Sequence, residues 1–230
     1  MTDARTEVLN RIREALGSGS PATQGPVPRG YRSAGQWEPG SAGALELLVD
    51  RLADYKARVH RVAGDEIAAT VARLVTELPL AGDAAETGSR GDVSAVVVPH
   101  GLDAAWLAGL PAGVQVVTDA PGQPLPASDL ERTDVVVTAA RVAIAETGTI
   151  VLDGEPGQGR RAISLVPDVH VCVIRADQVV QTVPEAVRLL AGHPARPLTW
   201  ISGPSATSDI ELDRVEGVHG PRTLHVVLVS

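Results

Sequence analysis

TDVVVTAARVAIAETGTIVLDG, residues 133–154, contains three short apolar runs that are separated by turns. These turns are too short to hold a helix, so the runs cannot all be parallel neighbours joined by helical crossovers. At least one antiparallel hairpin is therefore expected in this stretch. The rest of the chain predicts a parallel sheet, and this hairpin would extend out of that sheet.

Strands and helices alternate on both sides of this stretch. Strands are predicted from short apolar runs at 94–99, which reads as buried, and at 114–119, 169–175 and 224–229, and helices are predicted over 65–78, 101–110 and 184–192. Such alternation is typical of parallel sheets. The prediction is an α/β fold: an open, mainly parallel sheet with helices on both faces and one β-hairpin excursion.

The first 44 residues differ from the rest of the chain. Val8, Leu9, Ile12 and Leu16 recur at helical spacing, and Gly17 ends that pattern. Residues 17–44 are rich in Gly, Pro and Ser, which is typical of a linker. We therefore predict an N-terminal helix with a flexible arm over 1–44, and one folded domain over 45–230.

Composition excludes several classes of protein. The formal charge of −8 argues against binding to nucleic acid, which requires many Lys and Arg to displace counterions. No apolar run approaches the roughly 18 residues of a membrane span, and the N-terminus lacks the apolar core of a signal peptide. A cytoplasmic protein is expected. With Cys172 as its only cysteine and no H-x-x-x-H spacing, the chain is not expected to hold an iron–sulfur cluster or a metal ion.

Loops beyond strand ends are the expected ligand sites of such a sheet. In AETGT (145–149), Glu146 precedes a turn whose backbone N–H groups can form an anion nest, and Thr147, Gly148 and Thr149 complete it. A carboxylate beside such a nest can act as a nucleophile or a general base. The alternative is an ordinary hairpin turn with an exposed Glu at its mouth.

The next loop, GEPGQGRR (154–161), is rich in glycine and ends in Arg160 and Arg161. It matches neither the dinucleotide-binding fingerprint nor the P-loop. The two arginines are candidates to grip a carboxylate or a phosphate, and a solvated pair on a flexible loop is the alternative.

Two downstream segments add polar candidates. One loop offers hydroxyls that either bind an anion at a helix start or cap that helix; its candidates are Ser202, Gly203, Ser205, Thr207, Ser208 and Asp209. VEGVHGPR places His219 between two glycines, Gly217 and Gly220, and close to Arg222. A histidine there either transfers protons or holds a turn, and His100 after VVVP is a second candidate of the same kind.

Three segments together carry a family resemblance: AIAETGTIVLDGEPGQGRRAISLVPDVHVCVI, ISGPSATSDIE and GVHGPRTLHVVLV. In this order they resemble the signature of the LUD-domain family. The resemblance runs from about Leu45 to the end of the chain. It implies a fold similar to that of the sugar-phosphate isomerase, formyltetrahydrofolate cyclo-ligase and CoA-transferase superfamily.

The resemblance also implies a function. It points to a subunit of a three-subunit bacterial system that oxidises L-lactate to pyruvate, in which the two other subunits carry the iron–sulfur clusters. A loop-lined cleft for a small carboxylate or other anion, or for a partner, would then be expected here.

Two alternatives stay open. In CoA transferases of related fold, a Glu in a Ser-Glu-Asn-Gly turn forms an acyl intermediate, and Glu146 and Gly148 match two of those four positions. A stand-alone enzyme acting on an acyl-CoA, a folate or a sugar phosphate through Glu146 is therefore the first alternative. A non-catalytic scaffold that binds its partners through residues 1–44 is the second.

Overall fold

The computed structural model describes residues 3–17, 29–77, 95–207, 215–216 and 220–230. The chain divides into two compact units, residues 1–32 and 33–230. The first unit holds helix α1 (Ala4–Leu16), whose first turn is capped by the Asp3 side chain. None of its side chains is buried, so its apolar residues Val8, Leu9, Ile12 and Leu16 are exposed.

The second unit is built on a parallel sheet of six strands in the order β1-β12-β7-β4-β2-β3. Every neighbouring pair in it is parallel. The strands are β1 (Arg58–Val62), β2 (Ala95–Pro99), β3 (Gln115–Asp119), β4 (Val135–Ala139), β7 (Val169–Arg175) and β12 (Thr223–Val229). The predicted parallel α/β sheet is therefore confirmed.

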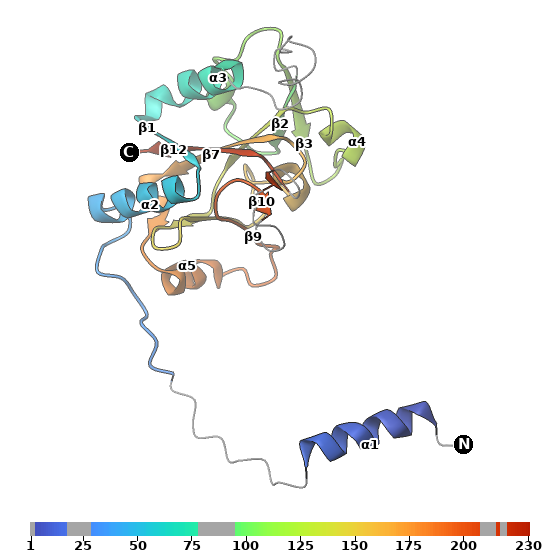
Figure 1. Cartoon of the computed structure of the whole chain (residues 1–230). Coiled ribbons are helices and arrows are strands. Elements are labelled where there is room, and N and C mark those ends of the chain that lie inside the picture. The colour runs from blue at the N-terminus through green and yellow to red at the C-terminus, as the bar shows by residue number, and fades with distance from the viewer. Residues whose placement is uncertain (1–2, 18–28, 78–94, 208–214, 217–219) are drawn as a thin grey trace. The chain divides into compact units, whose positions relative to one another are not determined.

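Helices cover both faces of this sheet (Figure 1). Because side chains alternate along a strand, Cys172 and Ile174 of β7 pack on the face that holds α2 (Ala42–Asp54). Val171 and Val173 face the opposite side and pack with α3 (Ile67–Glu77). Both faces are apolar, which explains the nearly unbroken run of valines in these strands.

The predicted hairpin is confirmed, and it belongs to a second sheet. Strands β5 (Val142–Ile144) and β6 (Thr149–Leu152) pair antiparallel. Strand β8 (Val179–Val180) joins β5 in parallel, and β9 (Thr199–Ile201) joins β6 antiparallel, giving the order β8-β5-β6-β9. Helix α5 (Val183–Leu190) buries Ala186 and Leu190 against this sheet.

Short elements complete the fold. The remaining helices are α4 (Ala127–Leu130) and the 3₁₀ helices η1 (Gly64–Glu66), η2 (Ala104–Leu107), η3 (Arg161–Ser164) and η4 (Ala176–Gln178). Strands β10 (Ala206–Thr207) and β11 (Val215–Glu216) form a small antiparallel pair. The helix expected over 101–110 is thus only a single 3₁₀ segment, because two glycines and Pro111 flank it. Within the described residues, no helix is long and apolar enough to cross a membrane.

Residues 33–41, which lie before α2, are held against the second sheet by one buried side chain. The Gln181 amide oxygen accepts the backbone N–H groups of Gln36, at 2.6 Å, and Trp37, at 2.9 Å. Gln181 is 4% exposed, and the Trp37 ring packs on the core beneath α2. Part of the segment expected to be a flexible arm is therefore attached to the domain.

Candidate functional site

The sheet contains one place where its strand connections diverge. From β2 the chain continues to β3 on one side, whereas from β4 it continues, through the second sheet, to β7 on the other side. Open α/β sheets bind ligands in the crevice beyond the carboxyl ends of two such strands. The crevice between β2 and β4 is therefore where a ligand is expected.

The glycine-rich loop lies at this crevice. The Gly157 N–H donates to the carbonyl of His100, which follows β2, at 2.8 Å. The Gly157 carbonyl accepts the N–H of Ala139, the last residue of β4, at 2.7 Å. One residue of the loop thus bridges both strand ends.

Glycine is required where this loop packs most closely. Gly159 has φ +74°, a left-handed conformation that other residues rarely adopt. A side chain there would also lie 2.9 Å from Cβ of Pro99 and overlap Ile163. Gly159 of this loop therefore serves close packing against the end of β2.

A cleft of about 410 Å³ opens beside the loop. Its walls include three prolines, Pro121, Pro156 and Pro197, and its charged side chains include Asp119, Arg160 and Arg196. His100 also lines it, and this residue is exposed. The cleft therefore combines rigid apolar walls with a small number of charges, as ligand sites usually do.

Arg160 is fixed at the cleft by a buried carboxylate. Its Nε–H donates to Oδ2 of Asp119 at 3.0 Å, and Nη2 donates to Oδ1 at 3.0 Å and to the Leu125 carbonyl at 2.6 Å. Asp119 is 4% exposed, whereas the Arg160 side chain is 40% exposed. Nε and Nη2 of the guanidinium are thus anchored at the end of β3, and Nη1 has no acceptor among the described residues.

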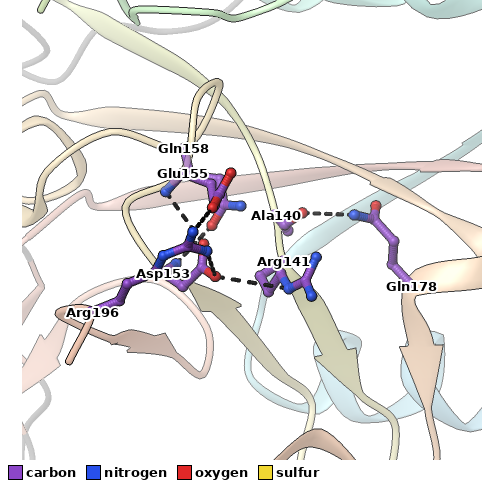
Figure 2. Close-up of polar contacts among 7 residues, drawn as sticks. All are labelled: Ala140, Arg141, Asp153, Glu155, Gln158, Gln178 and Arg196. Carbon is purple, nitrogen blue, oxygen red and sulfur yellow. Dashed lines mark hydrogen bonds and ion pairs between the residues drawn. The ribbon is translucent and has the colours of Figure 1, made fainter. Parts of the chain in front are cut away.

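Asp153, directly after β6, forms a second charged cluster at the cleft (Figure 2). Its carboxylate, which is 3% exposed, accepts a hydrogen bond from Arg196 at 3.2 Å and lies 3.8 Å from Nε of Arg141. Arg196 also pairs with Glu155. These contacts tie the glycine-rich loop to the segment before β9.

The AETGT turn lies at the other end of β6. The Thr147 hydroxyl donates to the Thr149 hydroxyl at 2.8 Å, and Thr149 is 2.8 Å from the Ser202 hydroxyl. Gly148 has φ +57° and packs on Arg51, while Gly203 packs on Tyr55, so both turns lie against the end of α2. The structure therefore brings these two predicted loops together.

Glu146 points into the contact with residues 33–41. Its Oε1 accepts a hydrogen bond from Nε2 of Gln181 at 3.0 Å. Since β6 has four residues, about 13 Å of strand separate this turn from the glycine-rich loop. The enzyme alternative that relies on Glu146 stays a prediction, and its residue does not line the cleft described above.

The remaining candidates lie near the amino end of β12 or outside the described residues. Arg222 pairs with Asp168 at 2.8 Å, just before β12 and β7, and the Ser205 N–H donates to the Pro221 carbonyl at 2.8 Å. Arg161 begins η3 with an exposed side chain. Ser208, Asp209, His219 and the side chain of Thr207 lie outside the described part of the chain. The described candidates thus lie apart: Arg160 at the carboxyl end of β3, Arg222 near the amino end of β12, and the AETGT and Ser202 turns at the amino end of β6 in the second sheet.

Sequence reasoning missed four charged residues of the cleft: Asp119, Asp153, Glu155 and Arg196. Two of them had a readable signal, because each acid directly ends an apolar strand, VQVVTD in one case and TIVLD in the other. A carboxylate at the carboxyl end of a parallel strand, such as Asp119 in β3, lies at the edge where ligands bind. Arg196 sits in a loop between α5 and β9 and had no comparable signal.

Two histidines, His170 and His225, and the cysteine are buried in the sheet, and His60 is partly buried; all four lie away from this cleft. His170 lies 2.7 Å from the Thr138 hydroxyl, and burial lowers its pKa to about 4. His60 and His225 lie 2.9 Å apart, and burial lowers the pKa of both, that of His225 to about 4. Burial raises the pKa of Cys172 to about 12. Among the described residues, no group of three or more such side chains is arranged to hold a metal ion.

Comparison with known proteins gives consistent results. The model of the LUD domain matches residues 45–229. A lactate utilization protein C from Deinococcus radiodurans is 42% identical over 233 aligned positions, which cover 99% of this chain and 96% of the relative. A protein of the same name from Bacillus subtilis is 33% identical over 106 positions, 44% of each chain. The crystal structure of a DUF162 family protein from Deinococcus radiodurans, 40% identical, superposes with a TM-score of 0.64 and covers 82% of this chain and 98% of that one.

Proposed function

Because the chain belongs to the LUD-domain family, we propose that it is a subunit of a bacterial system that oxidises L-lactate to pyruvate. In this proposal two other subunits carry the iron–sulfur clusters, and this chain is the subunit without redox centres. The observation that carries it is the 42% identity to a lactate utilization protein C over nearly the whole length of both chains.

The chemistry of this chain supports the division of labour. Iron–sulfur clusters are held by several thiolates, and this chain has one cysteine. Cys172 lies within β7 with none of its surface exposed, and its raised pKa keeps the thiol protonated. Electron transfer in the proposed system would therefore rely on partner subunits.

The cleft beside the glycine-rich loop is the proposed contribution of this chain. It lies beyond the carboxyl ends of β2 and β3, the side of the sheet on which sheets of this type bind ligands, and Arg160 presents Nη1 of its guanidinium there. A small anionic ligand is the class of molecule that such a group binds. We propose that the subunit binds this ligand rather than oxidising lactate by itself.

Growth on L-lactate tests the proposal. A strain that lacks this chain should fail to grow on L-lactate, grow normally on pyruvate, and recover when the full chain is restored. Normal growth on L-lactate, in a genome without a second copy, would overturn the proposal.

A pull-down tests the partner part separately. The tagged full chain, isolated from cells grown on L-lactate, should bring down two proteins and a stoichiometric amount of iron. If the deletion strain fails to grow on L-lactate but the pull-down brings down no iron protein, the role in lactate oxidation stands and the shared complex is rejected.

A further inference from the structure

The free edge of Arg160 is the starting point. Nε and Nη2 are occupied by Asp119 and by the Leu125 carbonyl. Nη1 has no acceptor among the residues that the structure describes, and the side chain is 40% exposed at the rim of the cleft. An arginine that is fixed along one edge has little conformational entropy left to lose when its other edge meets an anion.

The charges around the cleft limit how many negative charges the ligand carries. Asp119 is balanced by Arg160, while Asp153 and Glu155 are balanced by Arg196 and by Arg141 at the back of the cluster. The surroundings therefore have no excess positive charge. A polyphosphate would meet three carboxylates, whereas one anionic group can use the open edge of Arg160 alone.

The size and walls of the cleft indicate the rest of the ligand. About 410 Å³ lies within the range of roughly 300–1,000 Å³ that holds drug-sized molecules, and it exceeds the needs of a three-carbon acid. Pro121, Pro156 and Pro197 provide rigid apolar surfaces around this space. An apolar body with the bulk of one or two rings would bury such surfaces.

We propose that the cleft binds a ligand with a single anionic group and an apolar body, larger than lactate, and that Nη1 of Arg160 holds the anionic group. This inference rests on the proposed function only in taking the cleft as a ligand site. It makes the ligand of this subunit a different molecule from the lactate that the system consumes.

Three probes separate the two parts of the ligand. 2-Naphthoate has both the charge and the apolar body, 2-naphthalenemethanol has the body alone, and L-lactate has the charge alone. Isothermal titration of the full chain should give an affinity for 2-naphthoate that is at least about tenfold higher than the affinity for either of the other two probes. A tenfold difference in affinity is about the size expected of one charge-assisted hydrogen bond. Equal affinities for the naphthoate and the alcohol, or tighter binding of L-lactate, would overturn the proposal.

Two variants place the binding at this cleft. Arg160→Gln should lower the affinity for 2-naphthoate about tenfold and leave that for the alcohol unchanged. Because this change also leaves Asp119 unpaired, His100→Glu serves as a second variant: its side chain is exposed, so it adds a negative charge to the cleft without disturbing the fold. It should likewise weaken binding of the naphthoate alone.

A matched control lies on the neighbouring strand. Gln115→Glu adds the same charge at an exposed position at the amino end of β3, the opposite end from Asp119, and should leave all three affinities unchanged. If His100→Glu and Gln115→Glu behave alike, the cleft is not the site. The binding measurements do not depend on growth on L-lactate. A failed binding test therefore rejects the proposed ligand class, whereas a failed growth test rejects the proposed role in lactate oxidation.

Discussion

His170 makes the stability of this protein depend on pH. It lies in the central strand β7 with 1% of its surface exposed, and its ring contacts the Thr138 hydroxyl. Burial disfavours the charged imidazolium and lowers the pKa of His170 from 6.5 to about 4. In the unfolded chain the same ring binds a proton near pH 6.5.

The direction and the size of the change in stability with pH follow from this difference between the two pKa values. Since the unfolded state binds more protons between pH 6.5 and 4, the free energy of unfolding falls as the pH falls through this window. A shift of about 2.5 pKa units corresponds to about 3 kcal/mol, lost completely only below pH 4. At pH 5 the loss from this one ring is about 2 kcal/mol relative to pH 7.5.

Urea unfolding at pH 7.5 and pH 5.0 measures this contribution. His170→Gln keeps a polar partner for Thr138 but does not titrate, so its free energy of unfolding should fall between the two pH values by about 2 kcal/mol less than that of the unaltered protein. The comparison is unaffected by any stability that the variant loses at both pH values. It also cancels the acid sensitivity of His60 and His225, which both proteins share.

His193→Gln provides the control, because this histidine is exposed in the loop after α5. The free energy of unfolding of this variant should fall between pH 7.5 and pH 5.0 by the same amount as that of the unaltered protein. The same pH dependence in His170→Gln and in the unaltered protein would show that the buried ring does not resist protonation, and would refute the reasoning.

Three further outcomes are expected. Gly148→Ala should lower the free energy of unfolding by at least about 1–2 kcal/mol, because φ is +57° and the new Cβ would lie 3.0 Å from the backbone of Arg51; an unchanged urea midpoint would contradict this. Asp153→Asn should cost about 1–3 kcal/mol in the same assay, since it weakens a buried contact with Arg196, and a neutral effect would show that the cluster adds no stability. Cys172 should resist a thiol reagent at pH 8 in the folded protein and react fully in urea; rapid reaction without urea would contradict its burial.

The main sheet was predictable because its inner strands are buried on both faces. VHVCVIR has no solvent-facing position before Arg175, so its composition alone distinguishes it from a surface strand. The pairing of β5 with β8 and of β6 with β9 was not predictable. Those contacts join segments of two to four residues that are distant in the chain, and such short segments carry no periodicity.

The candidate loops were recognised as polar, but their grouping depended on topology. AETGT and GEPGQGRR appear adjacent in the sequence, yet they flank the four residues of β6 and so lie at its two ends. The pairs formed by Asp119 with Arg160 and by Asp153 with Arg196 link residues 41 and 43 positions apart. No local pattern contains information about contacts at that range.

The hydrogen bonds of Gln181 determine where this protein can be shortened. The matched family region begins at residue 45, but a chain cut there would lose Gln36 and Trp37 and leave a buried amide oxygen without its two donors. It would also uncover the part of the core on which the Trp37 ring packs. A truncation that starts at Ser33 retains these contacts, so the smallest stable form of the protein extends about a dozen residues beyond the boundary of its family domain.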